Sequence, residues 1–255
     1  MPKFLMSSHG QPHGESPKID VNEYGAPRDG VPQVSQRRLL VQLVAIRCPR
    51  VPGPAAIAKT LNALMYDFEL SGVIYADVHD PLGLAVVAIE EKPSALVSKL
   101  RGVLGSATLP ESLVVKSEYA MLGRTYSSGF EPDLEDWLLH RPRRTLLNSA
   151  NEFGIWYPLR RKGGFERLEA GEKGAILREH GGIGRAYGEQ DLAHDIRLAC
   201  HGLDPNDNDF VIGLLGSDLH PLSHVVQAMR RTRQTAEFME KMGPFFVGHV
   251  LYRTE

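Results

Sequence analysis

The chain has 255 residues and a mass of 28.2 kDa, enough to bury a large core as one domain or as two smaller ones. A formal net charge of -2 and a pI near 6.6 argue against general nucleic-acid binding. We find no apolar stretch long enough to span a membrane and no basic-then-apolar signal pattern at the start of the sequence. We therefore expect a cytoplasmic protein.

The two cysteines and the first residues carry few functional signals. Cys48 and Cys200 predict neither a disulfide framework nor a metal site in a chain of this length, and we interpret both as small buried apolar residues. Residues 1–36 are rich in Gly, Pro, Ser and His and lack apolar periodicity, which predicts a poorly ordered arm. His9 and His13 have no third ligand nearby, so they do not indicate a metal site.

The first half of the chain predicts one compact unit over residues 37–140. Its expected elements are, in order, a strand over 39–46, a helix over 54–70, strands over 73–78 and 84–90, a helix over 94–104 and a strand over 113–122. The turn residues Asp80 to Gly83 indicate a hairpin between the two middle strands. This order is that of a ferredoxin-like unit, in which the helices cover one face of the sheet.

The same order returns in residues 141–255. The expected elements are a strand over 146–159, a helix over 169–187, strands over 193–200 and 209–215, a long helix over 222–242 and a strand over 245–252. We therefore predict an α+β fold of two ferredoxin-like units in tandem. The basic stripe of Arg230, Arg231 and Arg233 on the long helix is typical of a solvated face, and it has no aromatic platform for stacking bases.

Residues 123–137, between the two units, are dense in polar and aromatic side chains. They fit a plain linker. They fit equally a loop that grips the polar edge of a ligand through four side chains: Arg124, Tyr126, Ser127 and Ser128.

A histidine lies in the middle of an apolar stripe on the 169–187 helix. Helical spacing places four residues on one face: Ile176, His180, Ile183 and Tyr187. Gly181, Gly182 and Gly184 follow His180, although each glycine weakens a helix by about 1 kcal/mol relative to alanine. One interpretation is a core histidine bonded to a carbonyl, with glycines that end the helix. The other is an axial iron ligand, with glycines that make room for a porphyrin face.

Four motifs occur in order over residues 156–248. They are Trp156-Tyr157-Pro158 followed by Arg160, Arg161 and Lys162; Glu179-His180-Gly181 with Gly184-Arg185; Gly202-Leu203-Asp204 before Asp209-Phe210-Val211; and Gly243-Pro244-Phe245-Phe246-Val247-Gly248. In order and spacing the second half resembles the chlorite dismutase family, which includes coproheme decarboxylases. The first half matches only in its architecture.

The resemblance implies that His180 is the proximal iron ligand of heme b or of its precursor coproheme, in the C-terminal unit, with Gly184 among the residues beside the porphyrin. Family members place a glutamate against the second nitrogen of this histidine, and Glu237 is the candidate here. Arg160, Arg161 and Lys162 are candidates for pairing with the porphyrin propionates. Family members also assemble into rings, so we expect a homo-oligomer, with a pentamer as one form.

The resemblance leaves the reaction open. Counting back from the Gly202 turn places Asp195 on the distal side, whereas a shift of two residues places Arg197 there. An acid would suit proton transfer to peroxide, and a guanidinium would suit chlorite. Tyr157 resembles the tyrosine of coproheme decarboxylases, which can be oxidised beside a propionate. The leading hypothesis is a peroxide-dependent heme oxidoreductase, most concretely a coproheme decarboxylase; the alternatives are a chlorite dismutase, a non-catalytic heme carrier or sensor, and a scaffold without heme.

Overall fold

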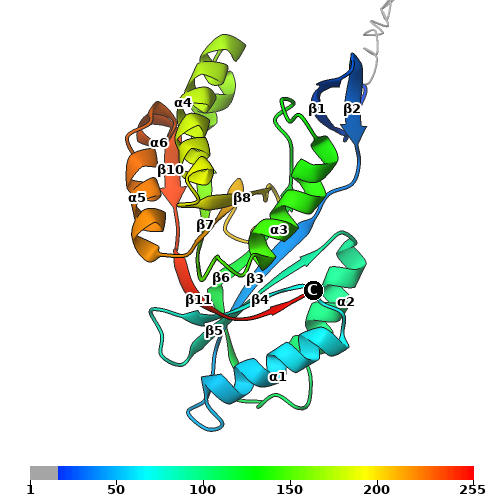
Figure 1. Cartoon of the computed structure of the whole chain (residues 1–255), viewed down its shortest axis with the longest axis vertical. Helices are drawn as coiled ribbons and strands as arrows, with labels where there is room; N and C mark the ends of the chain where they lie inside the picture. Colours follow the sequence, from blue (N-terminus) through cyan, green and yellow to red (C-terminus); the bar gives the residue numbers. More distant parts are fainter. Residues whose placement is uncertain (1–16) are drawn as a thin grey trace, which may run out of the picture.

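The computed structural model describes residues 17–255, and its N-terminal half contains a ferredoxin-like unit (Figure 1). The unit comprises β3 (Leu40–Arg47), α1 (Pro54–Asp67), β4 (Gly72–Asp77), β5 (Gly83–Glu90), α2 (Pro93–Leu104) and β6 (Val114–Thr125). The antiparallel strands lie in the order β4-β5-β3-β6. Helix α1 begins at a proline, which suits the first helical position, and buries Ile57, Leu61 and Met65 against the sheet. The predicted fold of this half is confirmed.

The second half repeats this topology. It comprises β7 (Phe153–Arg161), α4 (Ala170–Glu189), β8 (His194–Ala199), β9 (Phe210–Gly216), α5 (Leu219–Met229), α6 (Arg233–Phe238), β10 (Met239–Met242) and β11 (Phe246–Thr254). The order β8-β9-β7-β11 matches that of the first sheet. The tandem ferredoxin-like arrangement is thus confirmed for both halves.

The two sheets join edge to edge into a closed barrel. Six residue pairs connect β4 to β11, from Gly72 with Thr254 to Asp77 with Gly248. On the other side only two pairs connect β6 to β8, Arg124 with Ala199 and Thr125 with Leu198. The strand β10 lies outside this ring of strands and pairs only with the end of β7.

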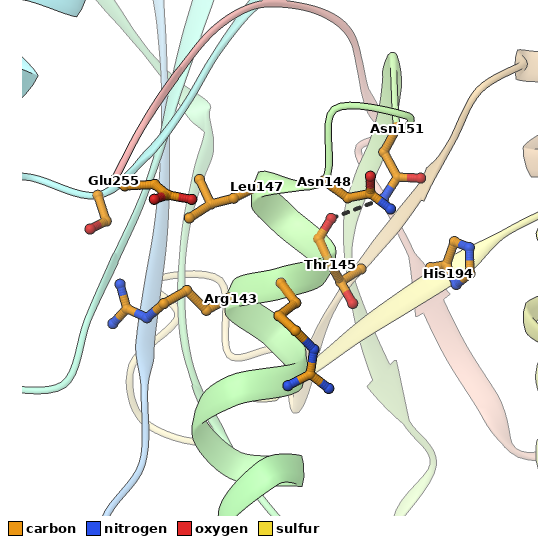
Figure 2. A pocket seen from close by; sticks show the side chains of 9 residues that line it. Arg143, Thr145, Leu147, Asn148, Asn151, His194 and Glu255 are labelled. Atoms are coloured by element: carbon orange, nitrogen blue, oxygen red, sulfur yellow. Dashed lines mark hydrogen bonds between the residues drawn. The ribbon is translucent and has the colours of Figure 1, made fainter.

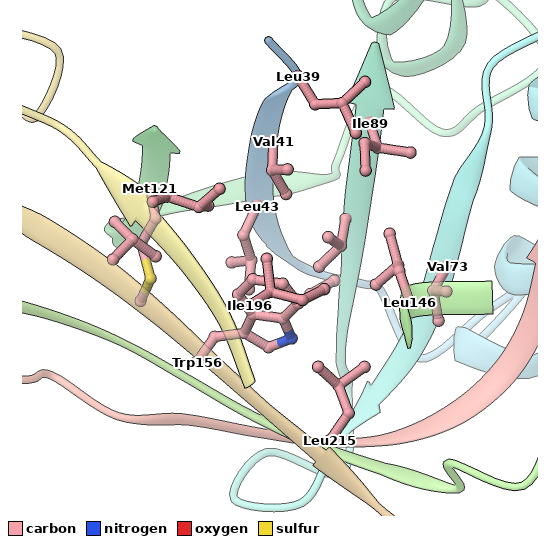
Figure 3. Packing of buried hydrophobic residues seen from close by; sticks show 14 of the residues in the cluster. Leu39, Val41, Leu43, Val73, Ile89, Met121, Leu146, Trp156, Ile196 and Leu215 are labelled. Carbon is pink, nitrogen blue, oxygen red and sulfur yellow. The ribbon is translucent and has the colours of Figure 1, made fainter. Parts of the chain in front are cut away.

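Large aromatic side chains fill the barrel. Figure 3 shows Trp156 surrounded by aliphatic side chains from several strands. A Cβ atom at Gly213 would lie 2.6 Å from the Trp156 ring, so a glycine is required where that ring crosses β9. Because strand side chains alternate, the neighbours of Trp156 on β7, Ile155 and Tyr157, face outward into the layer under α4 and α5.

Three predicted elements differ from the structure. Residues 146–159 are not one strand, because helix α3 (Arg141–Leu147) and a turn precede β7, and a π-helical segment (Asp136–His140) leads into α3. The predicted helix over 222–242 ends at Met229, and β10 pairs with β7 instead of continuing it. The predicted arm contains a hairpin, β1 (Glu23–Arg28) and β2 (Val31–Ser35).

Two smaller predictions complete the comparison. Cys48 and Cys200 are buried free thiols, as predicted. His9 and His13 lie outside the described residues. Over residues 17–255, no helix combines the length and the apolar character that crossing a membrane requires.

Candidate functional site

The outer face of the second sheet brings four of the predicted site residues together under helix α4. On β8, Ile196 and Leu198 point into the barrel, so Asp195 and Arg197 point outward. On β7 the same alternation places Tyr157 and Arg161 on the outer face.

His180 on α4 is a neutral imidazole with one nitrogen engaged. Its Nδ1 lies 3.1 Å from Oγ1 of Thr232, and that hydroxyl lies 2.7 Å from the carbonyl oxygen of Met229. Since the threonine proton is donated to the Met229 carbonyl, we assign Nδ1 as the protonated nitrogen that donates to Oγ1. This tautomer leaves the lone pair on Nε2, the atom that could bind a metal.

Burial lowers the pKa of His180 to about 4, and the positive charges of Arg197 and Arg161 lower it further. The imidazole is therefore neutral at neutral pH: it keeps the proton on Nδ1, and Nε2 is available as a ligand.

The partner of His180 is not the predicted one. Glu237 forms an ion pair with Arg233, with Oε2 2.9 Å from Nε. Thr232, which is 1% exposed, takes the place against the ring. Its position directly before helix α6, where threonine commonly caps a helix, is the only sequence signal that could have drawn attention to it.

Asp195 and Arg197, the two distal candidates, are paired with each other. Oδ2 of Asp195 lies 2.9 Å from Nε of Arg197, close enough for an ion pair but without the alignment of a hydrogen bond. Nη2 of Arg141 donates to Oδ1 of Asp195 at 2.5 Å. Burial alone would raise the pKa of Asp195, but the charges of Arg197 and Arg141 outweigh it and hold the pKa below its usual value. Sequence reasoning missed Arg141.

Tyr157 is a buried phenol in the same layer. It is 6% exposed and stacks on Phe245, with ring centroids 4.5 Å apart and planes at 26°. Burial raises the pKa of Tyr157 well above its usual value, and the negative charge of Asp195 raises it further. The side chain is thus a neutral phenol at any physiological pH.

The 123–137 segment divides between two roles. Arg124 and Ser127 bind Glu23 of the hairpin: its Oε1 lies 2.9 Å from Nη1 of Arg124, and its Oε2 accepts from the Ser127 amide at 2.9 Å and hydroxyl at 3.1 Å. Tyr126 instead turns toward the site and packs on Phe210, with ring centroids 5.6 Å apart. Of these residues, only Tyr126 therefore faces the layer between the outer face of the second sheet and helix α4. We call this layer, which contains His180, the His180 layer.

The two remaining candidate residues, Arg160 and Gly184, contact other parts of the chain. Arg160 points away from Arg161 and pairs with Asp207, with Nη2 2.7 Å from Oδ2. A Cβ atom at Gly184 would lie 3.3 Å from Cε of Met229, so this glycine permits the approach of α4 to α5.

Residues 85–251 match the family model described as chlorite dismutase. The chain belongs to the chlorite dismutase family. Comparison with curated protein sequences gives no match.

Solved structures share the fold over most of the chain. A heme-binding protein from Thermus thermophilus is 20% identical, with a TM-score of 0.69 over 85% of this chain and 92% of its own. A mutant chlorite dismutase from Candidatus Nitrospira defluvii is 14% identical, with a TM-score of 0.67 over 86% and 93%. The chlorite dismutase of that organism in complex with imidazole is also 14% identical, with a TM-score of 0.65 over 86% and 93%.

The side chains of the His180 layer fit an iron porphyrin in three respects. His180 has a neutral ring nitrogen, Nε2, that could bind iron. The buried Nε atoms of Arg161 and Arg197 lack an aligned hydrogen-bond acceptor, which suits anionic groups. Partly buried apolar side chains line the layer, among them Ile183, Phe210, Ile212 and Met229.

Other kinds of site receive no support here. Within the described part of the chain, no three His, Cys, Asp or Glu side chains come together as a set of metal ligands. The cavity of about 770 Å³ beside α3, lined by residues such as Arg143, Asn148 and His194, includes none of the predicted site residues (Figure 2). The His180 layer is therefore the candidate site.

Proposed function

We propose that this protein binds an iron porphyrin through Nε2 of His180 and acts as an oxidoreductase on a small oxidant. The observation that carries the proposal is the neutral imidazole whose Nδ1 is held by Thr232. A similar structure, the Thermus thermophilus protein, is described as heme-binding. A bound iron porphyrin would supply the redox centre at which the oxidant is reduced.

The polar side chains around the layer would orient the porphyrin. Arg161 lies with its guanidinium carbon 4.2 Å from the ring centroid of Phe165 and 4.8 Å from that of Phe210. Held between two rings, it keeps its charge in an apolar setting, where it would pair with a propionate by charge-assisted hydrogen bonds. We propose Arg161 as the main propionate partner, because its contact with Glu166 is long, 3.4 Å from Nη1 to Oε1, whereas Arg160 and Arg124 lie 2.7 Å and 2.9 Å from carboxylates of the chain.

Coproheme decarboxylation is the most concrete form of the proposal. Each propionate would lose carbon dioxide, two electrons and one proton to become a vinyl group, while one hydrogen peroxide takes up those two electrons, that proton and one further proton from solvent and yields two waters. Tyr157, a buried phenol that keeps its proton, would give up an electron together with that proton and pass the oxidation to a propionate. We therefore assign it as the catalytic residue.

Chlorite dismutation is the second candidate, favoured by Arg197. Its Nε–H lacks an aligned acceptor and its side chain is turned to the outer face of β8, so it could hold an anionic oxidant. The reaction converts chlorite to chloride and dioxygen, without an added reductant. A heme carrier without turnover is the remaining alternative.

Reconstitution with coproheme tests these functions. The wild-type protein should give a shifted Soret band that His180→Ala loses, and hydrogen peroxide should convert the porphyrin to products that lack one and then two propionates by mass spectrometry. Tyr157→Phe should bind coproheme but leave its mass unchanged, whereas Tyr66→Phe, at a position 75% exposed, should behave as wild type. An unchanged porphyrin mass in the wild type removes the decarboxylase assignment, and oxygen evolution from chlorite would then support the second candidate.

We also propose that the chain forms a homo-oligomer, with a pentameric ring as the specific expectation, because members of the chlorite dismutase family assemble into rings. Light scattering coupled to size-exclusion chromatography measures the assembly mass and would contradict this if it gave the 28.2 kDa of one chain.

A further inference from the structure

Two arginines share one carboxylate and one indole ring at the edge of the His180 layer. The carboxylate of Asp195 contacts Arg141 through Oδ1 at 2.5 Å and Arg197 through Oδ2 at 2.9 Å. The guanidinium carbons of Arg141 and Arg197 lie 4.6 Å and 4.8 Å from the ring centroid of Trp137. Strand β8 therefore does not position Arg197 alone; α3 and the segment before it contribute as well.

The local structure before α3 fixes this arrangement. The π-helical segment Asp136–His140 leads directly into Arg141, so Trp137 lies about one turn before Arg141 on the same side. Nε1 of Trp137 donates to the carbonyl oxygen of Tyr126 at 3.0 Å, which fixes the ring plane. Arg141 can then stack on the indole and reach Asp195 at the same time.

The cluster carries an unbalanced positive charge. Two guanidiniums face one carboxylate, so the three groups sum to +1, and Arg161 adds a further positive charge at the layer. Without Arg141, Asp195 and Arg197 would form a neutral pair. An ion pair that is already balanced attracts a further anion only weakly, whereas an arginine that shares its carboxylate keeps part of its charge for a ligand.

We propose that Arg141 is a positioning residue of the distal side: by occupying one oxygen of Asp195 and packing on Trp137, it keeps Arg197 fixed and positively charged toward a small anionic ligand above the iron. This inference rests on the proposed function, because it assumes an iron porphyrin on His180. It adds Arg141, a residue outside the sheet, to the distal side. It also requires the ligand on that side to be an anion.

Fluoride binding to the ferric protein loaded with hemin tests the charge. Arg141→Met removes the charge at nearly constant length and should raise the fluoride dissociation constant about tenfold, as expected for a unit charge roughly 10 Å away at an effective dielectric constant near 20. Arg141→Lys should recover part of the affinity. Arg143→Met is the matched control, because Arg143 lies two residues further along α3 and lines the cavity of Figure 2. Wild-type affinity in Arg141→Met, or an equal loss in Arg143→Met, overturns the proposal.

The apoprotein gives a second measurement that does not depend on heme. Trp137 and Trp156 are the only tryptophans of the chain, and Trp156 is 0% exposed, so acrylamide quenching of fluorescence reports mainly on Trp137. Arg141→Met should increase the quenching constant about twofold, because a guanidinium no longer covers the ring, and Arg143→Met should not. If hemin gives no Soret band dependent on His180, the heme proposal fails, and the quenching result alone decides whether Arg141 holds the cluster. Unchanged quenching in Arg141→Met rejects the positioning role.

Discussion

The hydroxyl of Thr232, in the turn between α5 and α6, lies 3.1 Å from Nδ1 of the His180 imidazole on α4. The threonine donates its own proton to the Met229 carbonyl and so offers the ring only a lone pair. The proton on Nδ1 and the free electron pair on Nε2 are both consequences of this contact.

Replacing Thr232 should therefore weaken metal binding. Thr232→Val keeps the shape but removes the acceptor, and we expect a hemin affinity about tenfold lower, in the range typical of lost partners behind a metal-bound histidine. Thr232→Ser should restore most of it, and Thr235→Val, whose hydroxyl lies 3.4 Å from that of Thr232, is the control. Titration followed at the Soret band measures the affinity. Equal binding by Thr232→Val and wild type would show that the contact does not tune the histidine.

The apoprotein should lose stability in mild acid through His180. The pKa of His180 is about 4 in the folded chain, against an ordinary value of 6.5. Above pH 6.5 the histidine is neutral in both states and contributes no pH dependence, whereas between pH 6.5 and 4 only the unfolded chain takes up the proton. The free energy of unfolding should fall over this window by on the order of 3 kcal/mol.

Urea unfolding of the apoprotein at about pH 7 and about pH 4.5 checks this expectation. His180→Gln removes the titrating group, so its loss of stability between the two pH values should be smaller than that of the wild type by about 2 kcal/mol. Parallel losses in the two proteins would mean that His180 is not desolvated in the apoprotein.

Asp195 should be important for stability as well as for the site. Asp195→Asn leaves the guanidiniums of Arg141 and Arg197 without their shared charge partner, and we expect unfolding to be easier by about 1–3 kcal/mol. Asp191→Asn is the control on the preceding turn, since the Asp191 side chain is 92% exposed. Denaturation in urea measures both. If the free energy of unfolding of Asp195→Asn differs from that of the wild type by less than about 0.5 kcal/mol, the ion pairs contribute no more than weak surface contacts do.

The hairpin of β1 and β2 should loosen when Glu23 is removed, although Ala26 and Gln33 still bind the segment over 131–134. Glu23 accepts two hydrogen bonds from Ser127 and one from Arg124, so Glu23→Ala should increase proteolytic cleavage within residues 17–36 several-fold. The barrel does not include these strands and should keep its unfolding midpoint. Glu118→Ala, at an exposed position of β6, serves as the comparison, and equal cleavage of the two variants would contradict the anchoring role.

Local patterns in the sequence were sufficient for most of the fold. Alternating and helical apolar periodicity identified α1, α2, α4 and most strands, because each of these elements buries one face. The periodicity also continued past Met229 and concealed the break before α6. A turn follows Met229 and α6 begins at Arg233, whereas residues 239–242 pair as β10 with the end of β7, a contact made at the level of the tertiary structure.

The site was only partly accessible to the same reasoning. The motifs identified His180, Tyr157 and Arg161, and strand alternation predicted that Asp195 and Arg197 share a face, as the structure shows them to do. Arg141 and Thr232 were missed, because Arg141 reaches the layer from α3 and Thr232 from the turn before α6, and no local pattern encodes the positions of these segments.

The two seams between the sheets differ in their number of paired residues, and this difference determines where the barrel opens most easily. Opening the β6–β8 seam breaks far fewer backbone hydrogen bonds than opening the β4–β11 seam, so local fluctuations concentrate at Arg124 and Thr125. The next residue, Tyr126, contacts the candidate site, and β8 itself carries Arg197. We therefore expect any opening of the barrel to begin at the β6–β8 seam, beside the layer under α4, with the β4–β11 seam still closed.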